Sequence, residues 1–141
     1  MAAPTFSYLT DVYFSPGAAG QVPAICERLG ISHPLLVTDP GIMALGLTER
    51  LELPSVSVFA GVHANPTVEN VEAGVEVWQE RECDGVIGLG GGSPIDCAKA
   101  IALRATHSGP LESYALVQGG TQRITADRPP VVAVPTTAGT G

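Results

Sequence analysis

Residues 85–96, which read GVIGLGGGSPID, join a strand to a helix. Residues 85–89 are an apolar run typical of a strand buried on both faces of a parallel sheet. A helix is predicted from Pro94 to about residue 105, and four of the five residues 88–92 are glycines. Glycines let the backbone approach a bulky anion, and the helix start presents free N–H groups and a positive dipole end. The pattern predicts a pyrophosphate-binding loop; the alternative is a tight turn without a ligand.

Polar residues predict where this helix begins. Ser93 is a natural N-cap, Pro94 suits the first helical position, and Asp96 completes a Ser-x-x-Asp capping box. The glycine spacing imitates the Rossmann fingerprint, but that fingerprint follows the first strand and precedes an acidic residue by about 20 residues. Here the acidic candidate, Asp39, lies before the glycines. The loop is therefore not a standard Rossmann loop.

The flanking sequence repeats the alternation of strands and helices. Apolar or β-branched runs predict further strands, and apolar residues at helical spacing predict further helices. The strands are expected at residues 5–14, 34–38, 55–60 and 131–134, and the helices at residues 18–29, 42–51 and 67–82. Such alternation indicates βαβ units. The predicted fold is a single α/β domain, residues 1–141, with a mostly parallel, Rossmann-like sheet flanked by helices and an N-terminal edge strand.

Two other segments follow predicted strands and so fall on the ligand-binding edge of the sheet. Asp39 ends the strand at 34–38, where a carboxylate can accept hydrogen bonds from the ribose hydroxyls of an adenosine. Its alternative role is to initiate the turn at Asp-Pro-Gly. Residues 135–141, PTTAGTG, follow the last strand and offer small hydroxyl side chains and N–H groups for phosphate or ring contacts.

Composition excludes several classes of partner. The chain has 7 basic and 14 acidic residues, a net charge of −7, and no basic stripe, which argues against nucleic acid. No apolar stretch approaches the roughly 20 residues that span a bilayer. The three cysteines lack metal or disulfide spacing, which predicts a reducing, cytoplasmic location. His33, His63 and His107 are far apart and are expected in loops or at the surface.

Taken together, the motifs resemble those of the iron-containing (group III) alcohol dehydrogenases. The matching segments occur in the same order along the chain and are VTDPG at 37–41, NPT at 65–67, GGGSPID at 90–96 with Lys99-Ala100, and VPTTAGTG at 134–141. The resemblance implies an NAD(P)-binding α/β domain of the dehydroquinate synthase-like, iron-alcohol-dehydrogenase type. It also implies a C-terminal helical domain, absent from this chain, that holds a divalent metal, iron in this family.

The resemblance also implies roles for individual residues. Asp39 would bind the adenosine ribose, the glycine loop the pyrophosphate, the threonines the nucleotide near the domain cleft, and Asn65 the nicotinamide side. The full set of expected cofactor-binding residues is Asp39, Asn65, Gly90, Gly91, Gly92, Ser93, Asp96, Thr136, Thr137 and Thr140. No catalytic residue and no metal ligand are expected in this chain, so by itself it is expected to be inactive.

The implied activity is hydride transfer between nicotinamide and a small alcohol or aldehyde. NAD is expected in preference to NADP, because a carboxylate at Asp39 repels a 2′-phosphate. The alternative function is a stand-alone nucleotide-binding or regulatory module with a flavodoxin-like sheet. Only 15% of the residues are charged, below the usual 25% or so, which predicts a partly covered surface and a homo-oligomer.

Overall fold

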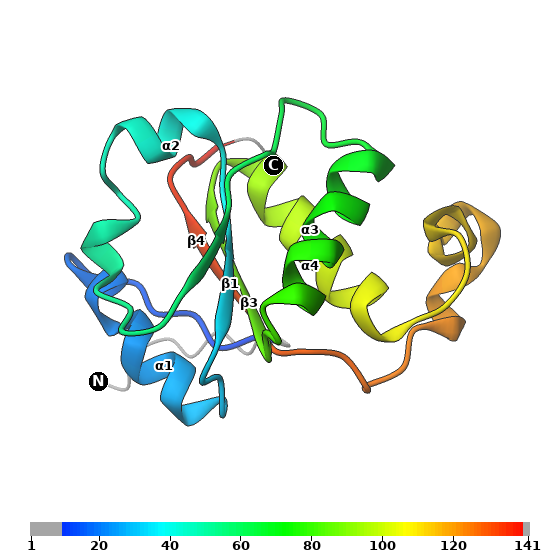
Figure 1. Cartoon of the computed structure of the whole chain (residues 1–141), viewed down its shortest axis with the longest axis horizontal. Coiled ribbons are helices and arrows are strands. Elements are labelled where there is room, and N and C mark those ends of the chain that lie inside the picture. The colour runs from blue at the N-terminus through cyan, green and yellow to red at the C-terminus, as the bar shows by residue number, and fades with distance from the viewer. Residues whose placement is uncertain (1–9, 140–141) are drawn as a thin grey trace, which may run out of the picture.

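Four parallel strands form the centre of the molecule (Figure 1). The computed structural model describes residues 10–139. The strands are β1 (Pro34–Val37), β2 (Ser57–Phe59), β3 (Gly85–Gly90) and β4 (Val131–Pro135), in the order β2-β1-β3-β4. The parallel α/β sheet predicted from the alternating pattern is therefore confirmed.

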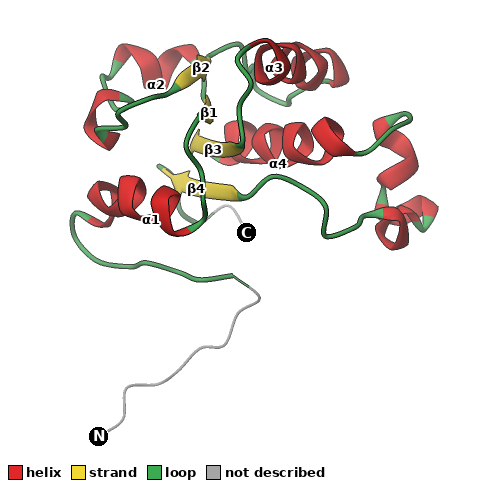
Figure 2. Cartoon of the chain, turned by 60° about the horizontal axis from the view of Figure 1, so that its bottom comes forward, coloured by secondary structure: helices red, strands yellow, loops and turns green. Residues whose placement is uncertain are grey.

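Helices cover both faces of this sheet (Figure 2). One face carries α1 (Val22–Arg28) and α2 (Pro40–Ala44), and the other carries α3 (Val68–Glu80) and α4 (Gly92–Thr106). Short 3-10 helices complete the fold: η1 (Ala18–Gln21), η2 (Glu49–Leu51), η3 (Leu111–Tyr114), η4 (Leu116–Gln118) and η5 (Gly120–Arg123). The result is a three-layer arrangement with the sheet in the middle.

The core is divided by the two-residue period of the strands. Leu35, Val37 and Val86 point to the α3/α4 face, whereas Leu36 and Ile87 point to the α1/α2 face. Successive side chains of a strand alternate between faces, and here both faces are covered by helices. This is why the strands read as continuous apolar runs, and why the buried interior of the sheet could be predicted from sequence.

Two predicted elements differ from the structure. The predicted N-terminal strand lies partly outside the described residues, and its described part, residues 10–14, is not a strand. Phe14 there is 98% exposed, and β-prone residues form a strand only when they pair with a neighbour. The helix predicted at 42–51 is broken into α2 and η2, because Gly46 adopts a left-handed conformation with φ of +65°.

A small lobe, residues 108–130, is attached to the end of α4 by His107. His107 lies in a loop directly after α4, one of the two positions expected for it, but it is buried rather than at the surface, with only 8% of it exposed. Its Nε2 accepts the Thr125 N–H at 3.0 Å, which leaves the ring proton of the neutral imidazole on Nδ1, 3.1 Å from the Leu103 carbonyl. The ring also meets Tyr114 edge-on at 5.6 Å. His107 therefore joins α4 to the lobe, a role that sequence spacing does not reveal.

We expect His107→Ala to destabilise the chain by about 2 kcal/mol, because the Thr125 N–H and the Leu103 carbonyl lose a buried partner. Urea unfolding of the variant measures this loss. His63→Ala, at an exposed position, is the matched control and should change stability by less than about 0.5 kcal/mol. Equal stability of the two variants would show that His107 does not hold the lobe.

Candidate functional site

The carboxyl ends of β1, β3 and β4 meet at one edge of the sheet. After β1 the chain forms β2 on one side, then returns to form β3 on the other side of β1. The direction of strand addition therefore reverses between β1 and β3, and ligands of open α/β sheets bind outside the strand ends at such a point. Asp39 follows β1, and the glycine loop follows β3. The structure thus brings these two predicted segments together at the switch point.

Asp39 is held in place by capping α2. Its Oδ1 accepts the Ile42 N–H at 2.9 Å, and the residue is half-buried. A carboxylate offers about four acceptor sites, so this cap leaves Oδ2 able to accept further hydrogen bonds. That oxygen lies on the side of Gly90, 3.4 Å from where a Cβ of residue 90 would stand. Asp39 therefore serves as the turn-forming cap and also presents a fixed carboxylate oxygen at the sheet edge.

Gly90 is the tightest point of the loop. Its φ of +141° strongly favours glycine, and a Cβ there would lie 2.8 Å from Pro94 Cγ. The Gly90 carbonyl accepts the Thr136 N–H at 2.8 Å, which ties the loop to the end of β4. Thr137 lies next to the loop as well, since a Cβ on Gly91 would stand 3.6 Å from its Oγ1. Thr136 and Thr137 are exposed at this edge, and Thr140 is outside the described residues.

The start of α4 differs from the prediction. The helix begins at Gly92 with Gly91 at the N-cap, and no side chain caps it, so the capping box of Ser93 and Asp96 is wrong. Ser93 is already the second helical residue, whereas a capping hydroxyl must precede the helix. Pro94 is tolerated at the third position because first-turn N–H groups have no acceptor within the helix. The first turn therefore keeps its N–H groups without a side-chain cap, as an anion site requires.

Asn65 and Asp96 lie at the starts of α3 and α4 and are exposed. Asn65 has φ of +57°, a left-handed conformation that asparagine tolerates. The predicted N-cap at Thr67 is confirmed, since its Oγ1 accepts the Asn70 N–H at 3.3 Å and Asn70 Oδ1 accepts the Thr67 N–H. Asp96 accepts a long hydrogen bond of 3.5 Å from Lys99.

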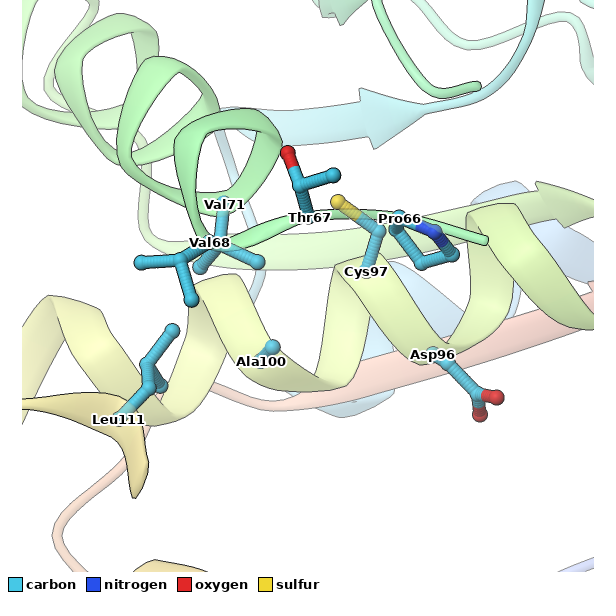
Figure 3. Close-up of a pocket in the computed structure, with 8 residues that line it drawn as sticks. All are labelled: Pro66, Thr67, Val68, Val71, Asp96, Cys97, Ala100 and Leu111. Carbon is cyan, nitrogen blue, oxygen red and sulfur yellow. The ribbon is translucent and has the colours of Figure 1, made fainter. Parts of the chain in front are cut away.

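A cavity of about 260 Å³ lies between the first turns of α3 and the body of α4 (Figure 3). Its lining is mostly apolar and consists of Pro66, Thr67, Val68, Val71, Asp96, Cys97, Ala100 and Leu111. Asp96 is the only predicted cofactor residue in this set, and its carboxylate points away from the other lining side chains (Figure 3). Burial raises the pKa of the Cys97 thiol to about 11, so little reactive thiolate is present at neutral pH.

Sequence reasoning did not single out Thr38. Its side chain is fully buried, and its hydroxyl donates to the Leu89 carbonyl at 2.8 Å, between the ends of β1 and β3. The available signal was a hydroxyl residue at the end of the apolar run 34–38.

Within residues 10–139 no group of three or more His, Cys, Asp or Glu side chains is arranged to hold a metal ion. No helix in that range is long and apolar enough to cross a membrane.

Comparison with known proteins identifies the family. A family model described as "Iron-containing alcohol dehydrogenase" matches residues 10–141. The chain belongs to this family. It is 45% identical over 138 residues to 4-hydroxybutyrate dehydrogenase of Cupriavidus necator and 43% identical over 145 residues to 1,3-propanediol dehydrogenase of Citrobacter freundii. These matches cover 95% and 96% of the chain and 36% of each relative, so the chain spans about a third of their length.

Solved structures show the same fold. A 1,3-propanediol oxidoreductase superimposes with a TM-score of 0.77 at 38% identity, covering 91% of this chain and 34% of that protein. A sulfoacetaldehyde reductase from Bifidobacterium kashiwanohense, solved in complex with NAD+, superimposes with a TM-score of 0.76 at 31% identity, covering 88% of this chain and 33% of that one. The family resemblance inferred from the motifs is therefore confirmed.

We expect Gly90→Ala to destabilise the chain by about 1–3 kcal/mol, because the Cβ meets Pro94 and the φ is unfavourable. Gly92→Ala is the control, since nothing lies within 4 Å of its Cβ position. Thermal unfolding followed by circular dichroism compares the two variants. A Gly90→Ala chain as stable as Gly92→Ala would contradict the packing described for this loop.

Proposed function

We propose that this chain is the cofactor-binding part of an NAD-dependent, metal-dependent alcohol dehydrogenase. The supporting observation is the convergence of Asp39, the glycine loop and Thr136 at the strand switch point. Family membership favours this function over a stand-alone nucleotide-binding or regulatory module. NAD accepts or donates a hydride when it is bound. The chain's own contribution is to hold and orient that cofactor.

The proposed roles follow from the positions of the residues. Asp39 accepts hydrogen bonds from the adenosine ribose through the oxygen that does not cap α2. The pyrophosphate lies against the loop and the uncapped first turn of α4, where N–H groups and the helix dipole favour an anion. Flanking contacts to the nucleotide are assigned to Thr136, Thr137 and Thr140, and contacts on the nicotinamide side to Asn65. Asp96, in the exposed part of α4 next to the loop, is kept as a further cofactor-binding residue. The open space at Gly92 is consistent with a close approach of the ligand.

We assign the metal and most of the substrate pocket to a C-terminal helical domain outside this chain. A metal held there, iron by family membership, would supply Lewis-acid chemistry at the substrate oxygen. The substrate class is a small alcohol or aldehyde, by analogy with the named relatives. We expect the 141-residue chain alone to bind no catalytic metal and to show no turnover.

We also propose a cytoplasmic location. Cys26, Cys83 and Cys97 are all free and buried, which suits a reducing compartment. Burial raises the pKa of each of these thiols, and the charge of Asp84 adds to the effect at Cys26.

We predict that the chain binds NAD+ at least about tenfold more tightly than NADP+, because the Asp39 carboxylate repels a 2′-phosphate. Asp39→Asn keeps an N-cap for α2 and removes the charge, so the preference should fall towards unity. Isothermal titration calorimetry with both cofactors measures the two dissociation constants. Asp127→Asn, an exposed change of the same charge in the lobe, is the control and should keep the preference. Equal or tighter binding of NADP+ by the unsubstituted chain would contradict the proposal.

We propose that the protein is a homo-oligomer, and we predict that this chain self-associates. Exposed apolar side chains occur at several places, including Val12, Phe14, Leu45, Leu116 and Val117, which is 93% exposed. Such surface favours association, whereas the net charge of −7 opposes it until salt above about 0.15 M screens the repulsion. Sedimentation velocity should show a larger species as protein and salt rise, and less of it after Leu116→Ser with Val117→Ser. A single monomeric species at high protein and salt would refute this expectation.

A further inference from the structure

The Thr38 side chain makes a buried contact between the two strands that flank the candidate site. Thr38 and His107 are the buried polar residues of the described part of the chain. The Thr38 hydroxyl donates to the Leu89 carbonyl at 2.8 Å, and its backbone N–H donates to the Phe59 carbonyl of β2 at 2.9 Å. One residue thus bonds to both neighbours of β1.

The hydroxyl replaces a backbone donor that β1 does not supply. β1 ends at Val37, and the chain then turns away through Asp39 and Pro40 into α2. Successive N–H groups of a strand point to opposite sides, and the Thr38 N–H donates to β2, so the next backbone donor towards β3 would be the Asp39 N–H. Asp39 has already left the strand to cap α2, and no hydrogen bond joins its N–H to the Leu89 carbonyl. A buried carbonyl without a donor is costly, and the Thr38 hydroxyl satisfies the one at Leu89.

The hydrogen bond between Thr38 and Leu89 lies one residue before Asp39 and one residue before Gly90, which face the ligand-binding edge of the sheet. Thr38 precedes Asp39, and Leu89 precedes Gly90. The Asp39 Oδ2 atom and the Cβ position of Gly90 are 3.4 Å apart, and the Gly90 carbonyl is fixed in turn by the Thr136 N–H at 2.8 Å. The spacing between the carboxylate and the loop is therefore set from the interior of the sheet.

We propose that Thr38 is a positioning residue for cofactor selectivity. Its hydroxyl holds the Asp39 carboxylate at a fixed distance from the glycine loop, and this distance sets how strongly a free 2′-hydroxyl is preferred over a 2′-phosphate. The inference rests on the proposed cofactor function. It adds a buried residue, with no access to the ligand, to the determinants of selectivity.

The test compares dissociation constants for NAD+ and NADP+, measured by isothermal titration calorimetry on the 141-residue chain and its variants. Thr38→Val keeps the shape and removes the donor, and we expect the NAD+ preference to fall roughly fivefold, the effect of one lost hydrogen bond. Thr38→Ser keeps the donor and loses a methyl group, and we expect a preference within about twofold of the unsubstituted chain.

If Thr38 only stabilised the fold, Thr38→Val would leave the ratio of the NAD+ and NADP+ dissociation constants unchanged. Val75→Ala, a buried change in α3 outside the loop, serves as the destabilised control and should weaken stability without changing the ratio of the two constants. An unchanged ratio in Thr38→Val, or a changed ratio in Thr38→Ser, would overturn this inference and leave the proposed function intact. Failure of the unsubstituted chain to prefer NAD+ would overturn the proposed function, and the inference with it.

Discussion

The close contact between β3 and α4 is the constraint on which the candidate site depends. No side chain separates them at Gly88, where a Cβ would stand 3.0 Å from both Ile95 Cα and Ala98 Cβ. Gly85, at the other end of β3, leaves room for the Ile31 side chain, which belongs to the core on the α1/α2 face. Because α4 lies so near the sheet, the chain passes from the end of β3 at Gly90 to the start of α4 at Gly92 through Gly91 alone. Gly88 therefore determines how closely α4 packs on β3, and Gly90 determines the shape of the loop.

Polar groups at the carboxyl ends of the strands stabilise the fold and also remain placed to contact a ligand. Asp39 caps α2 with one carboxylate oxygen, and its other oxygen is on the side of Gly90. The Thr136 N–H holds the Gly90 carbonyl, while the first turn of α4 remains without a side-chain cap. Groups that are fixed by bonds within the fold need little reordering when a ligand binds, which lowers the entropic cost of binding.

Much of this edge could be predicted because burial leaves a clear trace in the sequence. Strands covered on both faces must be apolar throughout, and parallel strands place their ends together, so Asp39 and the glycine loop could be assigned to one edge. The helix start at Gly92 was missed because Ser93 suits a cap equally well by type, and only the path of the backbone decides. The roles of Thr38 and His107 were also missed, since each depends on a carbonyl or N–H that tertiary contacts bring near.

The central claim is that the carboxyl ends of β1, β3 and β4 form a dinucleotide site. The most direct test is a titration of the ¹⁵N-labelled chain with NAD+, followed through the amide resonances in two-dimensional NMR spectra. The account predicts that the largest shifts occur at Asp39, at Gly91–Ser93 and at Thr136–Thr137, while the lobe at 108–130 is unaffected. Shifts concentrated in the lobe or along the α1/α2 face, or no shifts at saturating NAD+, would contradict it.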